Sequence, residues 1–119
     1  MEVTAYKFIN LDYLDMMSDG DLDMKKVMLD MLFEELPMEI SKMRQLTDTS
    51  DWNELKSVSH KMKSTLSFVG CEPMTTSNTE IEAICKTGGD AEKVTAHMVV
   101  LESNLDNVMN ELKMEYAKL

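Results

Sequence analysis

The sequence contains few of the residues that interrupt regular structure or cross-link a fold. It has four glycines, two prolines and two cysteines among 119 residues. Aromatic residues make up 6% of the chain and runs of β-branched residues are scarce, so helices are favoured over strands. Because Cys71 and Cys85 have neither Cys-x-x-Cys spacing nor a nearby histidine, we expect free buried thiols in a reducing compartment, not a disulfide or metal site.

Long apolar segments are also missing. The longest strongly apolar run, Met98–Leu101, is too short to span a bilayer, and residues 1–10 lack the apolar core of a secretory signal. A net charge of −10 opposes binding to nucleic acid or anionic membranes, since both attract clustered Lys and Arg. No G-x-x-x-x-G-K-[ST] motif occurs, so we expect no ATP site. We therefore expect a cytoplasmic protein without nucleic-acid or membrane partners.

Methionine, by contrast, is abundant, with 13 residues in the chain. Its flexible side chain adapts to irregular gaps, so most of these methionines are expected to fill the core. A methionine-rich binding groove is the alternative interpretation. The length of the chain favours a single domain over residues 1–119, large enough to bury one core without cross-links.

Turn residues and apolar periodicity divide the chain into helical segments. A short helix is predicted over residues 10–17, ended by Ser18-Asp19-Gly20. A long helix follows from about residue 21 to residue 47. Pro37 lies inside it and predicts a kink or a brief break. The expected apolar stripe of this helix consists of Met24, Val27, Met28, Met31, Leu32, Leu36, Ile40 and Met43.

Three further helices are predicted in the second half of the chain. One begins at Asp51 or Trp52, where Asp51 and Glu54 resemble a capping box, and runs to residue 69 before Gly70. The next starts with Pro73 in its first turn and ends at about residue 87. The last is capped by Asp90 and runs to about residue 116. Its apolar residues alternate in steps of four and three, as in a helix-bundle seam: Val94, Met98, Leu101, Leu105, Val108 and Leu112.

The fold class follows from this pattern. No segment has a convincing period of two, so the chain is predicted to be all-α. Four substantial helices joined by short turns favour an antiparallel up-and-down four-helix bundle. The short extra N-terminal helix is expected to cover one end of it.

One segment differs in charge from the rest of this acidic chain. The 17 positions from Leu55 to Cys71 contain no Asp or Glu, where an even distribution would place about three. The segment instead carries Lys56, Lys61 and Lys63 around His60. Because a neutral imidazole can act as a nucleophile at cellular pH, this arrangement predicts that His60 meets a negatively charged group.

Helical geometry indicates which way His60 points. Its neighbours at three, four and seven residues are all polar: Lys56, Ser57, Lys63, Ser64 and Ser67. The opposite face is the apolar stripe Leu55, Val58, Met62, Leu66 and Val69. His60 is therefore predicted to project outward, and a surface histidine without a function is the competing interpretation. His97 lies among mixed neighbours without a cationic setting and is interpreted as structural.

The segment Ser59–Gly70 resembles the signature of histidine-containing phosphotransfer (HPt) domains, which is roughly Ala-His-x-Leu-Lys-Gly-Ser followed by a hydrophobic stretch ending in Gly. The resemblance extends over about residues 21–112. It includes Trp52 and Leu55 before the motif, Phe33-x-x-x-Pro37 upstream and Ile81-Glu82 downstream. The chain departs from the family pattern at three positions, with Ser64 in place of Gly, Ser59 in place of Ala and Asn78 in place of a small apolar residue.

The resemblance implies a phosphocarrier without an ATP site of its own. His60 would accept a phosphoryl group from an aspartate of a response-regulator receiver domain and pass it on, with a hybrid sensor histidine kinase as a further partner. Lys63 would neutralise phosphoryl oxygens, and Lys56, Lys61, Ser64 and Ser67 would contact the partner. The resemblance also implies a monomer with no metal or cofactor of its own, because Mg²⁺ is expected on the receiver domain.

Three other interpretations fit parts of the sequence. A non-catalytic helical adaptor would use the same bundle only to bind a partner. The phosphoacceptor hairpin of a histidine kinase would require a twin chain, and the acidic residue usual after its histidine is replaced here by Lys61. A metallohydrolase or a Cys–His enzyme has only scattered residues in its favour.

Overall fold

The computed structural model describes residues 6–119, which form five α-helices and no strand. Every predicted helix is present within two residues at each end, and the predicted all-α bundle is confirmed. Residues 1–5, in the stretch where the sequence predicts no secretory signal, lie outside the described part. The helices are α1 (Asp12–Ser18), α2 (Leu22–Asp48), α3 (Trp52–Val69), α4 (Glu72–Lys86) and α5 (Ala91–Ala117).

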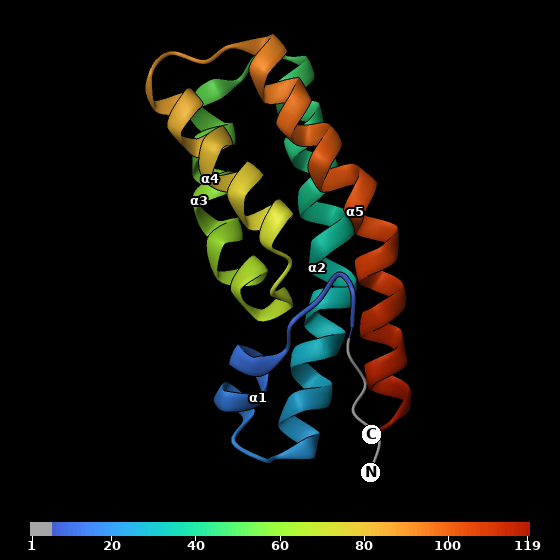
Figure 1. Cartoon of the computed structure of the whole chain (residues 1–119). Coiled ribbons are helices and arrows are strands. Elements are labelled where there is room, and N and C mark those ends of the chain that lie inside the picture. The colour runs from blue at the N-terminus through green and yellow to red at the C-terminus, as the bar shows by residue number, and fades with distance from the viewer. Residues whose placement is uncertain (1–5) are drawn as a thin grey trace.

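The four longer helices form a closed ring within one chain. α2 contacts α3 and α5, while α4 contacts α3 and α5. Because α3 and α4 are shorter than α2 and α5, the two long helices extend beyond them at one end (Figure 1). Helix α1 lies at that end and contacts α2 and α3, with Leu14 fully buried. No helix within residues 6–119 is long and apolar enough to cross a membrane.

Aspartate caps begin three of the helices. The carboxylates of Asp21, Asp51 and Asp90 each accept a hydrogen bond from the backbone N–H three residues later, at 3.0, 3.2 and 3.1 Å. Such caps satisfy a backbone donor that has no partner inside the helix. Gly70 ends α3 in the left-handed conformation, with φ of 69°. The caps therefore fix both ends of the helix that carries His60.

The sequence predicts a kink or a brief break at Pro37, and α2 continues through that residue without a break. A proline inside a helix removes one backbone hydrogen bond, because it has no N–H to donate. Leu36 and Ile40, on either side of Pro37, are buried. We attribute the continuity of α2 to this packing, which keeps both halves of the helix on the same core.

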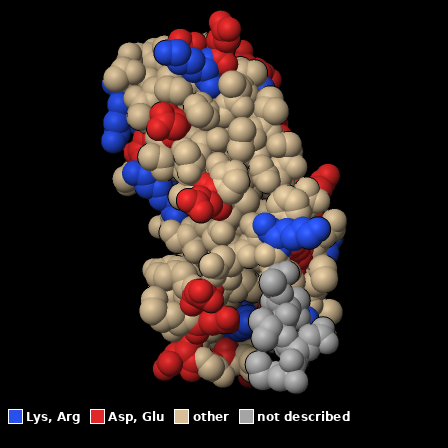
Figure 2. All heavy atoms as spheres, viewed as in Figure 1, with Lys and Arg blue, Asp and Glu red and all other residues tan. Residues whose placement is uncertain are grey.

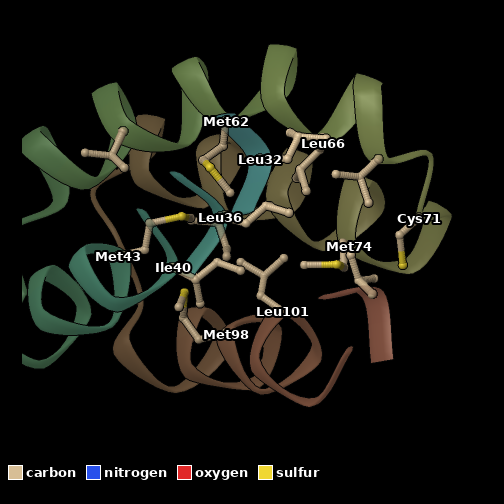
Figure 3. Close-up of a cluster of buried hydrophobic side chains, with 14 of the residues drawn as sticks. Leu32, Leu36, Ile40, Met43, Met62, Leu66, Cys71, Met74, Met98 and Leu101 are labelled. Carbon is tan, nitrogen blue, oxygen red and sulfur yellow. The ribbon is translucent and has the colours of Figure 1, made fainter. Parts of the chain in front are cut away.

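The core combines one apolar face from each helix of the ring (Figure 3). The predicted α5 seam is confirmed, with Leu105 partly buried and its other five residues fully buried. Cys71 and Cys85 are buried free thiols, as predicted. Four methionines are buried in the core: Met43, Met62, Met74 and Met98. The expectation that most methionines fill the core is wrong, because six others are exposed: Met16, Met17, Met24, Met31, Met38 and Met114.

The predicted apolar stripe of α2 is wrong in its N-terminal half. Met24 is 49% exposed and Val27 is 63% exposed, and Met31 also lies outside the core. The position facing the core is taken by Lys25, whose amino group lies 2.6 Å from carboxylate oxygens of both Asp15 and Glu115. A buried lysine is tolerated where carboxylates neutralise it.

Candidate functional site

His60 lies in the middle of α3 on its outer face, and its side chain is 69% exposed. The opposite face of α3 is buried through Leu55, Val58, Met62, Leu66 and Val69. The outward orientation predicted from helical periodicity is therefore confirmed. An imidazole in this position can be reached by another protein without any rearrangement of the bundle.

Although the segment around His60 has no acidic residue, an acid from another helix contacts the ring. Glu82 of α4 reaches across to α3, and its Oε2 lies 2.8 Å from Nδ1 of His60. Its Oε1 lies 2.6 Å from Nζ of Lys63, and Nζ of Lys86 lies 3.7 Å from Oε2. The carboxylate is 5% exposed, so it sits beneath the three side chains that it contacts. The segment from Leu55 to Cys71 lacks acids, but the neighbouring helix supplies one.

The Glu82 contact determines which ring nitrogen of His60 carries the proton. A carboxylate accepts hydrogen bonds, so Nδ1 must donate. In the neutral ring Nε2 then holds the free lone pair. The single carboxylate therefore does not close the site to an anion, because Lys63 and Lys86 balance its charge and Nε2 remains available as a nucleophile.

The lysine contacts keep Glu82 ionised. The hydrogen bond from Lys63 lowers the pKa of Glu82 to about 2 from 4.5, with His60, Lys63 and Lys86 adding to the effect and burial opposing it. At neutral pH the side chain is thus a carboxylate and a constant acceptor for Nδ1 of His60. The pair combines a fixed negative charge below the ring with an exposed imidazole above it.

This pKa predicts how stability depends on pH. A carboxyl whose pKa is lower in the folded state stabilises the fold above its unfolded pKa, and the contribution is lost as pH falls through the folded value. For Glu82 that window runs from about 4.5 down to about 2. Above this pH range we expect the unfolding free energy of the wild type to exceed that of Glu82→Gln. The difference should shrink as the pH is lowered through the range. Urea unfolding at several pH values would measure this, and a difference independent of pH would contradict it.

The other predicted site residues lie around His60 at different depths. Lys56 is partly buried, while Lys61, Ser64 and Ser67 are exposed. The hydroxyl of Ser67 donates to the carbonyl of Lys63 at 2.8 Å, so its proton is used within α3. Beside the imidazole is a shallow recess of about 470 Å³, lined by Lys56, Ser57, His60, Lys61, Glu82 and Lys86.

The charge distribution over the molecule is uneven. In Figure 2 several Lys and Arg side chains stand along the edge formed by α3 and α4, with some Asp and Glu side chains among them, and a cluster of Asp and Glu lies at the end near α1. Glu82 and Lys86 were not assigned to the site from the sequence, although Ile81-Glu82 was part of the family resemblance. The available signal was that Glu82 sits between buried positions, Ile81 and Cys85, on α4.

The described residues contain no metal-ligand cluster, and the second histidine lies apart from His60 on α5. Within residues 6–119 no group of three or more His, Cys, Asp or Glu could hold a metal ion. His97 lies on α5, partly buried, with Nδ1 at 3.2 Å from the hydroxyl of Ser77. Within the described residues His97 forms no ion pair, which fits its interpretation as a structural residue.

Comparisons with known proteins identify the family of the chain and a solved structure with a similar fold. The family model described as "Hpt domain" matches residues 27–115. Among solved structures, the HPT domain of a sensor hybrid histidine kinase from Shewanella is similar, with a TM-score of 0.77 and 22% sequence identity. The match covers 93% of this chain and 95% of that one. Comparison with curated proteins gave no match.

Proposed function

Since the chain belongs to the Hpt domain family, whose members are histidine phosphocarriers of two-component signalling, we propose that His60 is its phosphoryl acceptor. The donor and the final acceptor are aspartates on receiver domains of response regulators, and a hybrid sensor histidine kinase acts upstream. The observation that carries this proposal is the exposed imidazole whose Nδ1 is held by Glu82 among lysines. The protein itself takes no phosphoryl group from ATP and needs no cofactor of its own.

The reaction follows from the tautomer of His60. Nε2 attacks the phosphorus of the phospho-aspartate in line, the N–P bond forms, and the P–O bond to the aspartate breaks to release its carboxylate. The transition state is loose, with charge spread over the phosphoryl oxygens, so catalysis depends on positioning and electrostatics. The ring gains positive charge as the bond forms. The carboxylate of Glu82, 2.8 Å from Nδ1, stabilises that charge and keeps the Nδ1 proton in place.

The lysines of the site act on the phosphoryl oxygens. Lys63 is 46% exposed and paired with Glu82, so its amino group is held close to the ring yet open on one side. Lys56 and Lys61 border the recess beside the imidazole. Their charges favour both the incoming phosphoryl group and the acidic site of a receiver domain that holds Mg²⁺.

The partner docks over the outer faces of α2 and α3. Ser64, one turn after His60, is exposed and small, which lets a partner approach the helix. On α2, Met31 and Met38 are exposed one turn to either side of Glu35, and Glu35 shares a recess with Lys61. Exposed methionines next to a nucleophile surrounded by lysines match the composition of protein interfaces, in which methionine is enriched.

Transfer of label from a receiver domain tests this function. Receiver domains carrying ³²P on aspartate would be mixed with the protein in the presence of Mg²⁺, and the label on each chain followed with time. We expect label on this protein that is lost in acid and retained in alkali, as for a phosphoramidate. No transfer from any receiver of a broad panel, or label that is stable in acid, would refute the proposal.

Lys63→Ala should slow the transfer. The substitution removes the cation that pairs with Glu82 at 2.6 Å and leaves that carboxylate less neutralised, so both effects disfavour a transition state with negative charge on the phosphoryl oxygens. We expect the rate constant to fall about tenfold, equivalent to about 1.4 kcal/mol. Lys113→Ala, which removes an exposed lysine of α5, is the matched control and should leave the rate unchanged. Equal rates in the two variants would remove the electrostatic role assigned to Lys63.

A further inference from the structure

Ser59 and Asn78 form a buried polar pair between α3 and α4. Ser59 is completely buried and Asn78 is 1% exposed. The hydroxyl of Ser59 lies 2.9 Å from the backbone oxygen of Asn78 and 2.8 Å from its Oδ1. In return, Nδ2 of Asn78 donates to the backbone oxygen of Ser59 at 2.9 Å. Both residues differ from the family pattern, and the two polar side chains that differ form hydrogen bonds with each other.

The pair lies one helical turn from the functional contact. On α3, Ser59 immediately precedes His60, and on α4, Asn78 lies four residues before Glu82 on the same helical face. Two neighbouring sets of polar contacts therefore join the helices: Ser59 with Asn78, and His60 and Lys63 with Glu82. A shift of α4 along α3 would change the distances in both sets together.

The two sets of contacts differ in how strongly they restrict the positions of α3 and α4. Lys63 and His60 are long or rotatable exposed side chains, so they can follow Glu82 through a small displacement. The Ser59 and Asn78 contacts include a backbone oxygen of each helix, so they act on the helix positions themselves. Hydrogen bonds weaken steeply with distance and angle, whereas apolar contacts such as those of Met62 tolerate sliding. Buried polar contacts of this kind can specify register even where they add little stability.

We propose that Ser59 and Asn78 are positioning residues that set the register of α4 on α3, so that Glu82 reaches Nδ1 of His60 and leaves Nε2 as the nucleophile. The proposal rests on the function assigned to His60. The pair touches neither the phosphoryl group nor the partner. It acts through Glu82, whose carboxylate must stay within hydrogen-bond distance of the ring.

The test is the proton position in the His60 ring. In ¹⁵N-labelled protein, at a pH high enough for the imidazole to be neutral, the chemical shifts of Nδ1 and Nε2 report which nitrogen is protonated. We expect Nδ1–H in the wild type. In the double variant Ser59→Ala/Asn78→Ala, which leaves no orphaned polar group, the shifts should move toward those of Glu82→Ala. Transfer from a phosphorylated receiver should slow about tenfold.

Ser77→Ala is the matched control. Like Ser59→Ala, it removes a buried hydroxyl, but this hydroxyl belongs to α4 and faces His97 on α5. We expect a comparable loss of unfolding free energy, with His60 shifts and transfer rate unchanged. If the double variant does not fold, Ser59→Ala removes both hydrogen bonds of the hydroxyl and keeps the one donated by the Asn78 amide. The His60 shifts should then move part of the way toward those of Glu82→Ala, and unchanged shifts would overturn the proposal.

Two results are decisive in different ways. If the double variant is folded and the His60 shifts equal those of the wild type, the pair serves stability alone and the proposal is overturned. If the wild type accepts no phosphoryl group, the proposed function fails. The ¹⁵N shifts would still decide whether Ser59 and Asn78 control the Glu82 contact, so the two failures are distinguishable.

Discussion

His60→Gln should accept no phosphoryl group, with label at the background of the assay under conditions that phosphorylate the wild type. The substitution removes the nucleophilic nitrogen, and an amide at neutral pH cannot replace it. His97→Gln is the matched control, because His97 is the second histidine of the chain and contacts Ser77 on the far side of α4. We expect its label to equal that of the wild type. Equal labelling of His60→Gln would exclude His60 as the acceptor.

Loss of label in His60→Gln would not reflect unfolding. The side chain is largely exposed, and substitutions at exposed positions usually change the unfolding free energy by no more than about 0.5 kcal/mol. The amide of glutamine can donate to Glu82 in place of Nδ1. Denaturant unfolding checks this directly. The adaptor interpretation makes the opposite prediction for signalling, since it requires only partner binding, which His60→Gln would leave intact.

The bundle also bears on the interpretation as a kinase phosphoacceptor hairpin. A hairpin of that class completes its four-helix bundle with a second chain. Here α2 to α5 close the ring within one chain, so the fold around His60 needs no twin. The family match over residues 27–115 supports the same conclusion.

The helices could be predicted because their signals are local. Asp51 caps the backbone N–H of Glu54 three residues away, and Gly70 ends α3 through its own left-handed conformation. The orientation of His60 follows from the period of α3 alone. Each of these features is set within one or two helical turns, so a single segment of sequence contains the information.

The electrostatic details of the site could not be predicted in the same way. Glu82 meets His60 across 22 residues, and the contact depends on the register between α3 and α4. Nothing within the period of α3 reveals that register. The burial of Lys25 in place of Met24 has a similar origin, because its partners Asp15 and Glu115 lie on α1 and α5. Helix ends set by local caps were predicted correctly, whereas the contacts of Glu82 and Lys25 across helices were missed.

The packing of Gly70 illustrates the same dependence on a distant segment. Gly70 turns the chain from α3 to α4, and a Cβ built on it would overlap the backbone oxygen of Asn10. Asn10 cannot move away, because its N–H donates to the carbonyl of Val69 at 3.0 Å. The residues just before it are also fixed, since the carboxylate of Glu111 accepts the three successive N–H groups of residues 7–9 at 2.8–3.1 Å.

Gly70→Ala should therefore be strongly destabilising. The left-handed conformation costs a residue with a Cβ about 1 kcal/mol, and the backbone overlap should bring the total loss of unfolding free energy to about 2–4 kcal/mol. Gly20→Ala is the matched control, because Gly20 has φ of 79° but nothing within 4 Å of the added Cβ. It should lose about 1 kcal/mol or less. Urea unfolding of both variants measures the two losses. Equal losses would mean that the segment at Asn10 yields, and that strain at Gly70 is conformational alone.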